Sequence, residues 1–118
     1  MCACARGGGG RGCGGGSLAA QIAAKNSAHP VMVYSKSWCP YCLRVKGLLG
    51  ELGVDAKVVE LDEVIEGDEV QDTLLSITGV RTVPQVFVGG EFLGGCDDTL
   101  AAHQSGQLVP MLEGAGAL

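Results

Sequence analysis

Short β-branched runs alternate with longer segments of helical spacing along most of the chain. Ser17 opens the alanine-rich segment SLAAQIAAKN, and serine is a favoured helix N-cap. His29 and Pro30 end that segment, and VMVYS (31–35) follows as an unbroken apolar run. The pattern predicts a helix and then a short buried strand.

A second helical segment begins at the two cysteines that follow this strand. Its apolar side chains recur at the spacing of one helix face, and Gly53 supplies the end. Gly47 and Gly50 lie inside it and weaken the helix by roughly 1 kcal/mol each relative to alanine. The sequence does not decide whether they allow close packing. The predicted face consists of Tyr41, Val45, Leu48, Leu49 and Leu52.

The middle of the chain predicts another strand, another helix and then a hairpin. AKVVEL (56–61) has strand composition, and DEVQDTLLSITG (68–79) has helical spacing with Gly79 as its end. Strands at 85–88 and 91–94 are separated by a Gly-Gly pair, which is a strong signal for a tight hairpin. The apolar face of the helix consists of Val70, Leu74 and Ile77.

Two helices complete the pattern. The segment CDDTLAAHQSG begins one of them, with Asp97 or Asp98 as its cap, and the other covers about 108–113. The predicted order is α-β-α-β-α-β-β-α-α. Two strand–helix units followed by a hairpin give a mixed four-stranded sheet with helices on both faces, an α/β fold.

The first 16 residues, MCACARGGGGRGCGGG, differ from the rest in composition. Such a low-complexity segment buries too little apolar surface to offset its chain entropy, so we predict a disordered tail at 1–16 and one domain at 17–118. The tail is basic and acid-free, and is either a polar tail or part of an organelle transit peptide. Cys2 and Cys4 could bind a soft metal or oxidise between chains.

Length and composition limit the class of protein. The chain has 118 residues, 47% of them hydrophobic but only 4% aromatic, so one core built from aliphatic side chains is expected. No apolar run reaches the ~20 residues of a membrane helix. The net charge is −5, divided into +6 over residues 1–50 and −11 over 51–118. The two central cysteines lie in the basic half, which favours anionic partners there and argues against general nucleic-acid binding.

The placement of the cysteines argues against a secreted disulfide scaffold. Half of the six lie in the tail, and no secretory hydrophobic segment precedes them. A reducing compartment is therefore expected, namely the cytoplasm, or a plastid or mitochondrion if the tail belongs to a transit peptide. A C-x-x-C in such a compartment indicates redox or metal chemistry. The six are Cys2, Cys4, Cys13, Cys39, Cys42 and Cys96.

Cys39 and Cys42, in WCPYC, are the candidate catalytic residues. Pro40 favours the first helical position, which makes Cys39 the N-cap, where unpaired N–H groups and the helix dipole stabilise a thiolate. Lys36 adds a positive charge. Such surroundings lower a thiol pKa from ~8.5 to roughly 3.5–7.5. Cys39 is predicted to be the nucleophile, and Cys42, one turn further, the resolving thiol.

Two other roles for Cys39 and Cys42, a zinc site and a permanent disulfide, have less support in the sequence. A structural zinc site needs four ligands, whereas His29 and His103 are isolated in the sequence. A permanent disulfide across this short loop would be strained and reducible. Dithiol redox chemistry is the interpretation that remains, with no metal expected.

Three motifs together identify a family resemblance. WCPYC, TVP (82–84) and GGCDD (94–98) resemble the glutaredoxins, in particular the dithiol class with a C-P-Y-C site and plant or algal relatives. The resemblance runs from Val31 to Leu118 and leaves the tail out. It implies the thioredoxin fold, in agreement with the predicted order of elements.

The resemblance also implies a glutathione site. The Val83-Pro84 bond would be cis and would present the Val83 backbone to the cysteinyl part of glutathione. Lys36 and Gln71, with Arg81, would meet the glycine carboxylate. The start of the helix after Gly95 would meet the γ-glutamyl end. The implied set is Lys36, Tyr41, Gln71, Thr82, Val83, Pro84, Gly95, Cys96, Asp97 and Asp98.

Some of these residues have simpler interpretations. Asp97 and Asp98 suit helix caps, and Gln71 could close a capping box with Asp68. Lys36 could be a solvated charge, and Cys96 a small buried residue without chemistry. Trp38, next to the nucleophile, is either core packing or a docking surface for the partner.

The function implied is glutathione-dependent reduction of protein–glutathione mixed disulfides and protein disulfides. Glutathione is the cosubstrate, glutathionylated proteins are the partners, and glutathione reductase acts indirectly through the glutathione pool. We expect a monomer. The alternatives are a thioredoxin and an iron–sulfur carrier that bridges two chains through Cys39 and glutathione. Trp38-Cys39-Pro40-Tyr41-Cys42 differs from the W-C-G-P-C usual in thioredoxins.

Overall fold

The computed structural model describes residues 17–118, and the predictions made for the tail at 1–16 lie outside them. The predicted order of helices and strands is confirmed over this range. The elements are α1 (Leu18–Ala28), β1 (Val31–Ser35), α2 (Pro40–Glu51), β2 (Lys57–Glu60), α3 (Gly67–Thr78), β3 (Gln85–Val88), β4 (Glu91–Gly94), α4 (Cys96–Gln104) and α5 (Leu108–Gly114).

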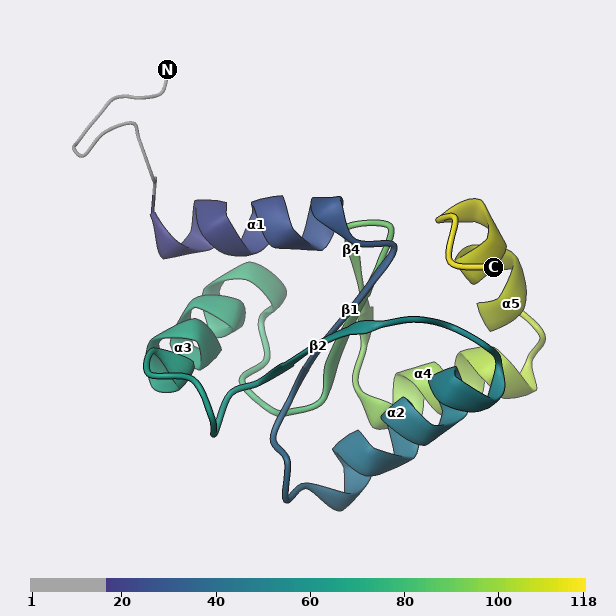
Figure 1. Ribbon diagram of the computed structural model, residues 1–118, viewed down its shortest axis with the longest axis horizontal. Helices are drawn as coiled ribbons and strands as arrows, with labels where there is room; N and C mark the ends of the chain where they lie inside the picture. Colours follow the sequence, from purple (N-terminus) through teal and green to yellow (C-terminus); the bar gives the residue numbers. More distant parts are fainter. Residues whose placement is uncertain (1–16) are drawn as a thin grey trace.

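The strands form one mixed sheet in the order β2-β1-β3-β4. β1 pairs with β2 in parallel, whereas β3 is antiparallel to both β1 and β4. Helices cover both faces: α1 and α3 lie on one side, and α2, α4 and α5 on the other (Figure 1). This three-layer α/β arrangement is the expected one.

Alternation along the strands distributes the core between the two faces. Val31 and Val33 of β1 pack with α2, α4 and α5, whereas Met32 and Tyr34 pack with α1 and α3. Because successive side chains of a strand point to opposite faces, a strand covered on both sides must be apolar throughout. All five residues of β1 are buried for this reason.

Local signals set most of the element boundaries. The Ser17 side chain accepts a hydrogen bond from the Ala20 N–H at 3.2 Å, so the predicted N-cap is confirmed. Gly79 ends α3 with a φ of 84°. Gly89 and Gly90 have φ values of 61° and 85°, the left-handed conformation that the hairpin turn requires.

Some predictions from helical spacing were wrong. Tyr41 and Ile77, both assigned to apolar helix faces, are exposed by 57% and 44%. Trp38 is exposed by 66%, which excludes the core-packing interpretation. Gly47 and Gly50 have open space where a Cβ would lie, so they do not allow close packing of another element.

The N-terminus of α4 also differs from the prediction. Its N-cap is Gly95, and neither Asp97 nor Asp98 occupies that position. The Asp98 carboxylate lies one turn inside and accepts a hydrogen bond from the Gly95 N–H at 3.3 Å. Asp98 therefore caps the helix from within. Among residues 17–118, no helix is both long enough and apolar enough to cross a membrane.

Candidate active site

Cys39 lies where β1 gives way to α2. It is the N-cap of α2, with extended backbone angles, and Pro40 is the first helical residue. Its N–H donates to the Lys36 carbonyl at 3.0 Å, and its carbonyl accepts from the Leu43 N–H at 3.1 Å. This confirms the predicted N-cap. Cys39 is 5% exposed and Cys42 is fully buried, in the order expected for nucleophile and resolving thiol.

The surroundings of Cys39 favour its thiolate. Burial alone would raise the pKa of Cys39, but hydrogen bonds from the Cys42 N–H, the Cys42 thiol and the Tyr41 N–H, together with the charge of Lys46, lower it below the usual value. The predicted low pKa is therefore supported. The charge that contributes to the lower pKa is that of Lys46, whereas the sequence reasoning named Lys36.

Cys42 has the opposite environment. Burial is the main cause that raises the pKa of Cys42 to about 11, and the neighbouring Cys39 sulfur adds to the rise. The Lys36 N–H and the Ser35 hydroxyl oppose it with hydrogen bonds. The surroundings of the two thiols therefore differ: those of Cys39 favour the thiolate, and those of Cys42 favour the protonated thiol.

Lys46 belongs to the surroundings of Cys39, and the sequence reasoning did not include it. It follows Cys39 by seven residues, two helical turns, so it lies on the same side of α2. Its ammonium lies 2.7 Å from the Glu60 carboxylate, and both side chains are 22% exposed. Helical spacing from Cys39 was the signal that could have found it.

A pocket of about 510 Å³ has Tyr41, which lies between the two cysteines in the sequence, in its lining, although neither Cys39 nor Cys42 lines it. Eight of the ten predicted glutathione residues line it, whereas Lys36 and Gln71 do not. Val80 and Phe92 line it as well, and the sequence reasoning did not include them. The lining consists of Tyr41, Val80, Thr82, Val83, Pro84, Phe92, Gly95, Cys96, Asp97 and Asp98.

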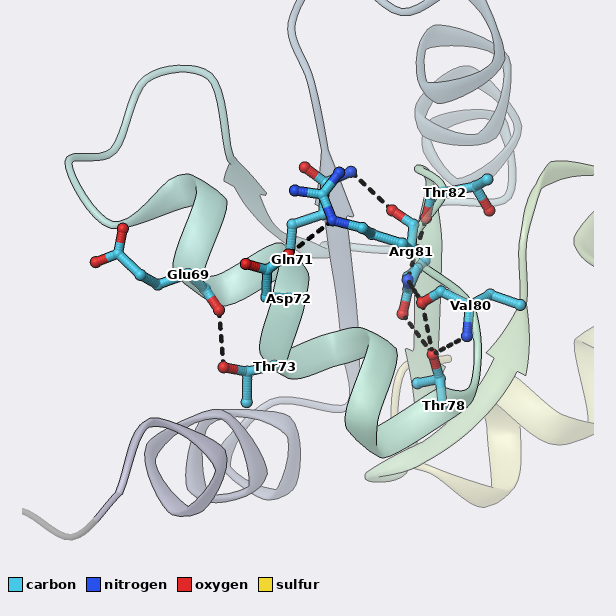
Figure 2. A network of polar contacts seen from close by, with 9 residues as sticks. Glu69, Gln71, Asp72, Thr73, Thr78, Val80, Arg81 and Thr82 are labelled. Carbon is cyan, nitrogen blue, oxygen red and sulfur yellow. Dashed lines mark hydrogen bonds and ion pairs between the residues drawn. The ribbon is translucent and has the colours of Figure 1, made fainter.

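Buried amides hold one wall of this pocket, the loop between α3 and β3. The predicted cis bond between Val83 and Pro84 is present in this loop. The Gln71 amide donates to the Arg81 carbonyl at 2.7 Å (Figure 2), and the Gln85 amide donates to the carbonyl of Thr82 at 3.1 Å. Gln71 therefore shapes the loop from α3 and closes no capping box. Its Oε1 is buried without a hydrogen-bond partner.

The other wall is the junction of β4 and α4. A Cβ at Gly94 would lie 2.3 Å from Asp98 Oδ2, and Gly94 has a φ of 140°, so the site needs glycine there. Cys96 is buried, and this burial raises its pKa. The burial of Cys96 fits the interpretation of a small buried residue, and Cys96 also lines the pocket. The first backbone N–H groups of a helix have no partner within it, so the start of α4 is suited to bind an anion.

The charged residues around the pocket differ in how they are engaged. The Lys36 ammonium lies 5.9 Å from the centre of the exposed Trp38 ring. Arg81 is paired with Asp72 at 2.8 Å, as Figure 2 shows. Ser37 donates from its N–H and its hydroxyl to the Asp62 carboxylate, which ties the loop before Cys39 to the end of β2.

No group of three or more potential metal ligands occurs among residues 17–118. Cys39, Cys42 and Cys96 are all free thiols. The alternative function, an iron–sulfur carrier, would use one cysteine from each of two chains. Such a cluster does not require three ligands within one chain.

Similarity to known proteins agrees with this geometry. The family model described as Glutaredoxin matches residues 31–93. A protein from Ricinus communis named glutaredoxin is 55% identical over 92 residues, covering 78% of this chain and 90% of its own. A rice protein named "Glutaredoxin-C4, chloroplastic" is 53% identical over 92 residues, covering 78% of this chain and 69% of its own.

A solved structure, the buckwheat glutaredoxin–glutathione complex, superposes with a TM-score of 0.80 at 43% identity, over 86% of this chain and 96% of that one. The family match spans both α2 cysteines and the loop with the cis proline. Sequence identity above one half with a plant relative and a shared thioredoxin fold lead to one conclusion: this chain belongs to the glutaredoxin family.

Proposed function

We propose that the protein is a glutathione-dependent thiol–disulfide oxidoreductase of the dithiol C-P-Y-C class. It removes glutathione from glutathionylated proteins and reduces protein disulfides. One observation carries this proposal: a cysteine of lowered pKa at a helix N-terminus lies beside a pocket lined by the residues that the family resemblance implies for glutathione. Family membership favours this function over that of a thioredoxin.

Glutathione would occupy the pocket as an extended anion. The backbone of Val83 offers its N–H and C=O to the cysteinyl part, and Thr82, Pro84 and Tyr41 flank it. The γ-glutamyl carboxylate accepts hydrogen bonds from the N–H groups of Cys96 and Asp97 after Gly95. The γ-glutamyl ammonium pairs with the carboxylate of Asp97 or Asp98.

At the glycine end, Gln71 acts by holding the Arg81 carbonyl, because its amide donates there. Lys36 supplies positive charge from the loop before Cys39 without lining the pocket. The site as a whole therefore offers hydrogen bonds at both ends of an anionic tripeptide.

The reaction begins with the Cys39 thiolate, which attacks the glutathione sulfur of a mixed disulfide. The S–S bond of the substrate breaks, the protein leaves as a thiolate that takes a proton from solvent, and Cys39 carries glutathione. A second glutathione thiolate attacks that sulfur, so that glutathione disulfide leaves and the Cys39 thiolate returns. This route does not use Cys42. With a protein disulfide, Cys39 attacks first and Cys42 then displaces the substrate, which forms the Cys39–Cys42 disulfide.

The proposed function also implies partners for the protein and a compartment in which it acts. Glutathione reductase would act through the glutathione pool, and the protein would act as a monomer, because the attack needs Cys39 reachable by its substrate. We place it in the cytoplasm. A plastid is the alternative, in keeping with the name of the rice relative. Imaging a fluorescent fusion of the whole chain separates the two.

The test is glutathione-dependent reduction of a glutathionylated protein by wild type, Cys39→Ser and Cys42→Ser. Cys39→Ser is expected to abolish turnover, while Cys42→Ser retains it. Coupling the assay in turn to glutathione reductase and to thioredoxin reductase identifies the reductant. Equal loss in the two variants, or turnover with thioredoxin reductase alone, would overturn the proposal.

A further inference from the structure

Two apolar side chains of the pocket have no counterpart in glutathione. Val80 and Phe92 line the pocket and are exposed by 41% and 36%. Glutathione joins γ-glutamate, cysteine and glycine, so it is charged at both ends and carries no aliphatic or aromatic side chain. The other lining residues are those that the family resemblance implies for glutathione. Val80 and Phe92 are therefore apolar surface that the polar groups of glutathione do not require.

Packing holds the ring of Phe92 in place. Phe92 in β4 is the register partner of Phe87 in β3, and the centres of their rings lie 5.3 Å apart at an angle of 47°. Phe87 is buried, and its ring meets the buried Tyr34 ring edge-on at 5.6 Å. The Phe92 ring thus rests on aromatic side chains of the core, and it lines the pocket from this support.

Hydrogen bonds hold the backbone of Val80. Its N–H donates to the Thr78 hydroxyl oxygen at 3.3 Å, one of the contacts drawn in Figure 2. Its carbonyl accepts from the Gln85 amide at 2.8 Å. Because both polar groups of the Val80 backbone are engaged, the side chain lines the pocket from a fixed position.

A preformed apolar surface of this kind favours the binding of another apolar group. Ligand pockets are lined mainly by apolar side chains, together with a few polar groups that fix the orientation of the ligand. Binding to side chains that are already held in place loses less conformational entropy than binding to mobile ones. Val80 and Phe92 therefore suit an aliphatic or aromatic group on a molecule that also reaches the glutathione site.

The substrate of the proposed reaction is such a molecule. In a mixed disulfide, glutathione is joined to a protein cysteine, so glutathione that enters the pocket brings the residues on either side of that cysteine with it. We propose that Val80 and Phe92 form an apolar subsite for a side chain that flanks the glutathionylated cysteine of the protein substrate. This inference rests on the proposed function. The two residues determine specificity, because they favour substrates with an aliphatic or aromatic neighbour of the cysteine.

The subsite acts in the first half of the reaction. The flanking side chain is present while the Cys39 thiolate attacks the mixed disulfide, and it leaves with the reduced protein before the second glutathione attacks. Contacts of Val80 and Phe92 with this side chain therefore change kcat/KM for the glutathionylated substrate. The second half of the reaction starts from the same Cys39–glutathione disulfide for every substrate.

The experiment compares peptides that differ in one flanking residue. Each peptide has seven residues, blocked ends and a glutathionylated cysteine in the centre. The parent peptide has serine at the other six positions, and each of six further peptides has one leucine in place of one serine. Three extended residues reach about 10 Å to either side of the cysteine. Turnover is followed with glutathione and glutathione reductase, and glutathione–cysteine disulfide serves as a substrate without flanking residues.

The proteins are wild type, Val80→Ser, Phe92→Ser, Phe92→Leu and Val64→Ser. Val64 is the matched control for Val80, because it is exposed by 42% and does not line the pocket. Phe92→Leu keeps an apolar side chain in the subsite. Val80→Ser leaves the backbone hydrogen bonds of residue 80 in place, so the test stays decisive if Phe92→Ser lowers stability.

For each protein, kcat/KM for a leucine peptide is divided by kcat/KM for the parent peptide. In wild type, this ratio is expected to reach about ten for at least one position of the leucine, because an aliphatic side chain leaves water for an apolar site. Val80→Ser and Phe92→Ser should each lower the ratio by about threefold or more, whereas Phe92→Leu and Val64→Ser should keep it. A merely structural role of Val80 or Phe92 would change both rates together and leave the ratio unaltered.

The outcomes separate the subsite from the proposed function. If wild type turns over neither the peptides nor glutathione–cysteine disulfide, the proposed function fails. If wild type turns over all of these substrates but gives every leucine peptide a ratio near one, the subsite is overturned while the proposed function stands. The same conclusion follows if either Val80→Ser or Phe92→Ser keeps the wild-type ratio, or if Val64→Ser lowers it as much as they do.

Discussion

The side-chain amide of Gln85 lies 2.8 Å from the carbonyl oxygen of Val80 and donates a hydrogen bond to it. The same amide bonds the Thr82 carbonyl, and Gln71 bonds that of Arg81. Two buried amides thus hold three successive carbonyls of the loop before the cis proline. Since this loop forms a wall of the pocket, the shape of the wall depends on side chains that do not line it.

Gln85→Leu is expected to raise the KM for a glutathionylated peptide by about tenfold, since the carbonyls of Val80 and Thr82 lose part-buried hydrogen bonds worth roughly 0.5–1.5 kcal/mol each. The alkylation rate of Cys39 should change little, because the contacts of the thiol lie on α2. Steady-state kinetics and iodoacetamide labelling measure the two effects. The exposed Gln104→Leu, also a glutamine replaced by leucine, should leave KM unchanged. An unaltered KM in Gln85→Leu would show that the loop keeps its shape without the amide.

Lys46→Met is expected to raise the pKa of Cys39, because the ammonium charge contributes to the lowered value. Alkylation by iodoacetamide should slow several-fold near pH 7, and the difference from wild type should vanish at alkaline pH, where the thiol is ionised in both. The pH profile of labelling measures this shift.

Controls for Lys46→Met are available nearby. Lys46→Arg keeps the charge and should keep the low pKa, and the exposed Lys57→Met should label as wild type does. The double variant Lys46→Met/Glu60→Gln removes the carboxylate that would otherwise remain unpaired. Coincident profiles for Lys46→Met and wild type would mean that the helix N-terminus alone stabilises the thiolate.

Local signals in the sequence predicted the fold well. The Gly-Gly turn fixed both hairpin strands at 85–88 and 91–94, and Ser17 marked the start of α1. These features depend on neighbours in the chain, whose backbone preferences are strong. The expected mixed sheet followed from the order of elements, because few arrangements of two strand–helix units and a hairpin bury all their apolar faces.

Helix faces were predicted less well for a physical reason. Periodicity shows that Ile77 and Tyr41 share a face with core residues, but not where the covering layer stops. Ile77 lies in the last turn of α3 and Tyr41 in the first turn of α2. At these helix ends the side chains are exposed instead of joining the core, and that of Tyr41 lines the pocket.

The site was predicted where one motif carries it and missed where distant segments meet. Cys39 as N-cap and the cis Val83-Pro84 bond each belong to a contiguous motif. The contacts of Ser35 and Lys46 with Glu60 join residues 25 and 14 positions apart. Such pairing depends on strand register and helix rotation, which composition and spacing do not determine.

Gly47→Ala is expected to stabilise the protein by about 1 kcal/mol, because the added methyl meets open space and alanine loses less chain entropy in a helix. Thermal unfolding should show Tm higher by about 4–8 °C. Gly67→Ala is the contrasting variant, since its Cβ would lie 1.8 Å from the Leu61 carbonyl oxygen. It should lose about 1–3 kcal/mol. A lower Tm for Gly47→Ala would contradict the open environment at that position.

Tyr34→Phe tests the polar contact buried under α1. The Tyr34 hydroxyl donates to Asn26 Oδ1 at 2.7 Å, and its loss leaves a buried acceptor unpaired, so the free energy of unfolding should fall by about 1–3 kcal/mol at pH 7. Urea unfolding under reducing conditions measures it. The exposed Tyr41→Phe is the matched control and should unfold as wild type does.

The effect of Tyr34→Phe should shrink at alkaline pH. Burial raises the pKa of Tyr34 from 10.0 to about 12, so between these values the folded state keeps a proton that the unfolded state has lost. The unfolding free energy of wild type therefore falls as pH rises through this window, and Phe lacks that contribution. Burial of Cys42, with its pKa of about 11, lowers stability in both proteins alike above pH 9. The difference between Tyr34→Phe and wild type should narrow from pH 9 to 11. A constant or widening difference would show that Tyr34 ionises as easily in the folded protein as in the unfolded one.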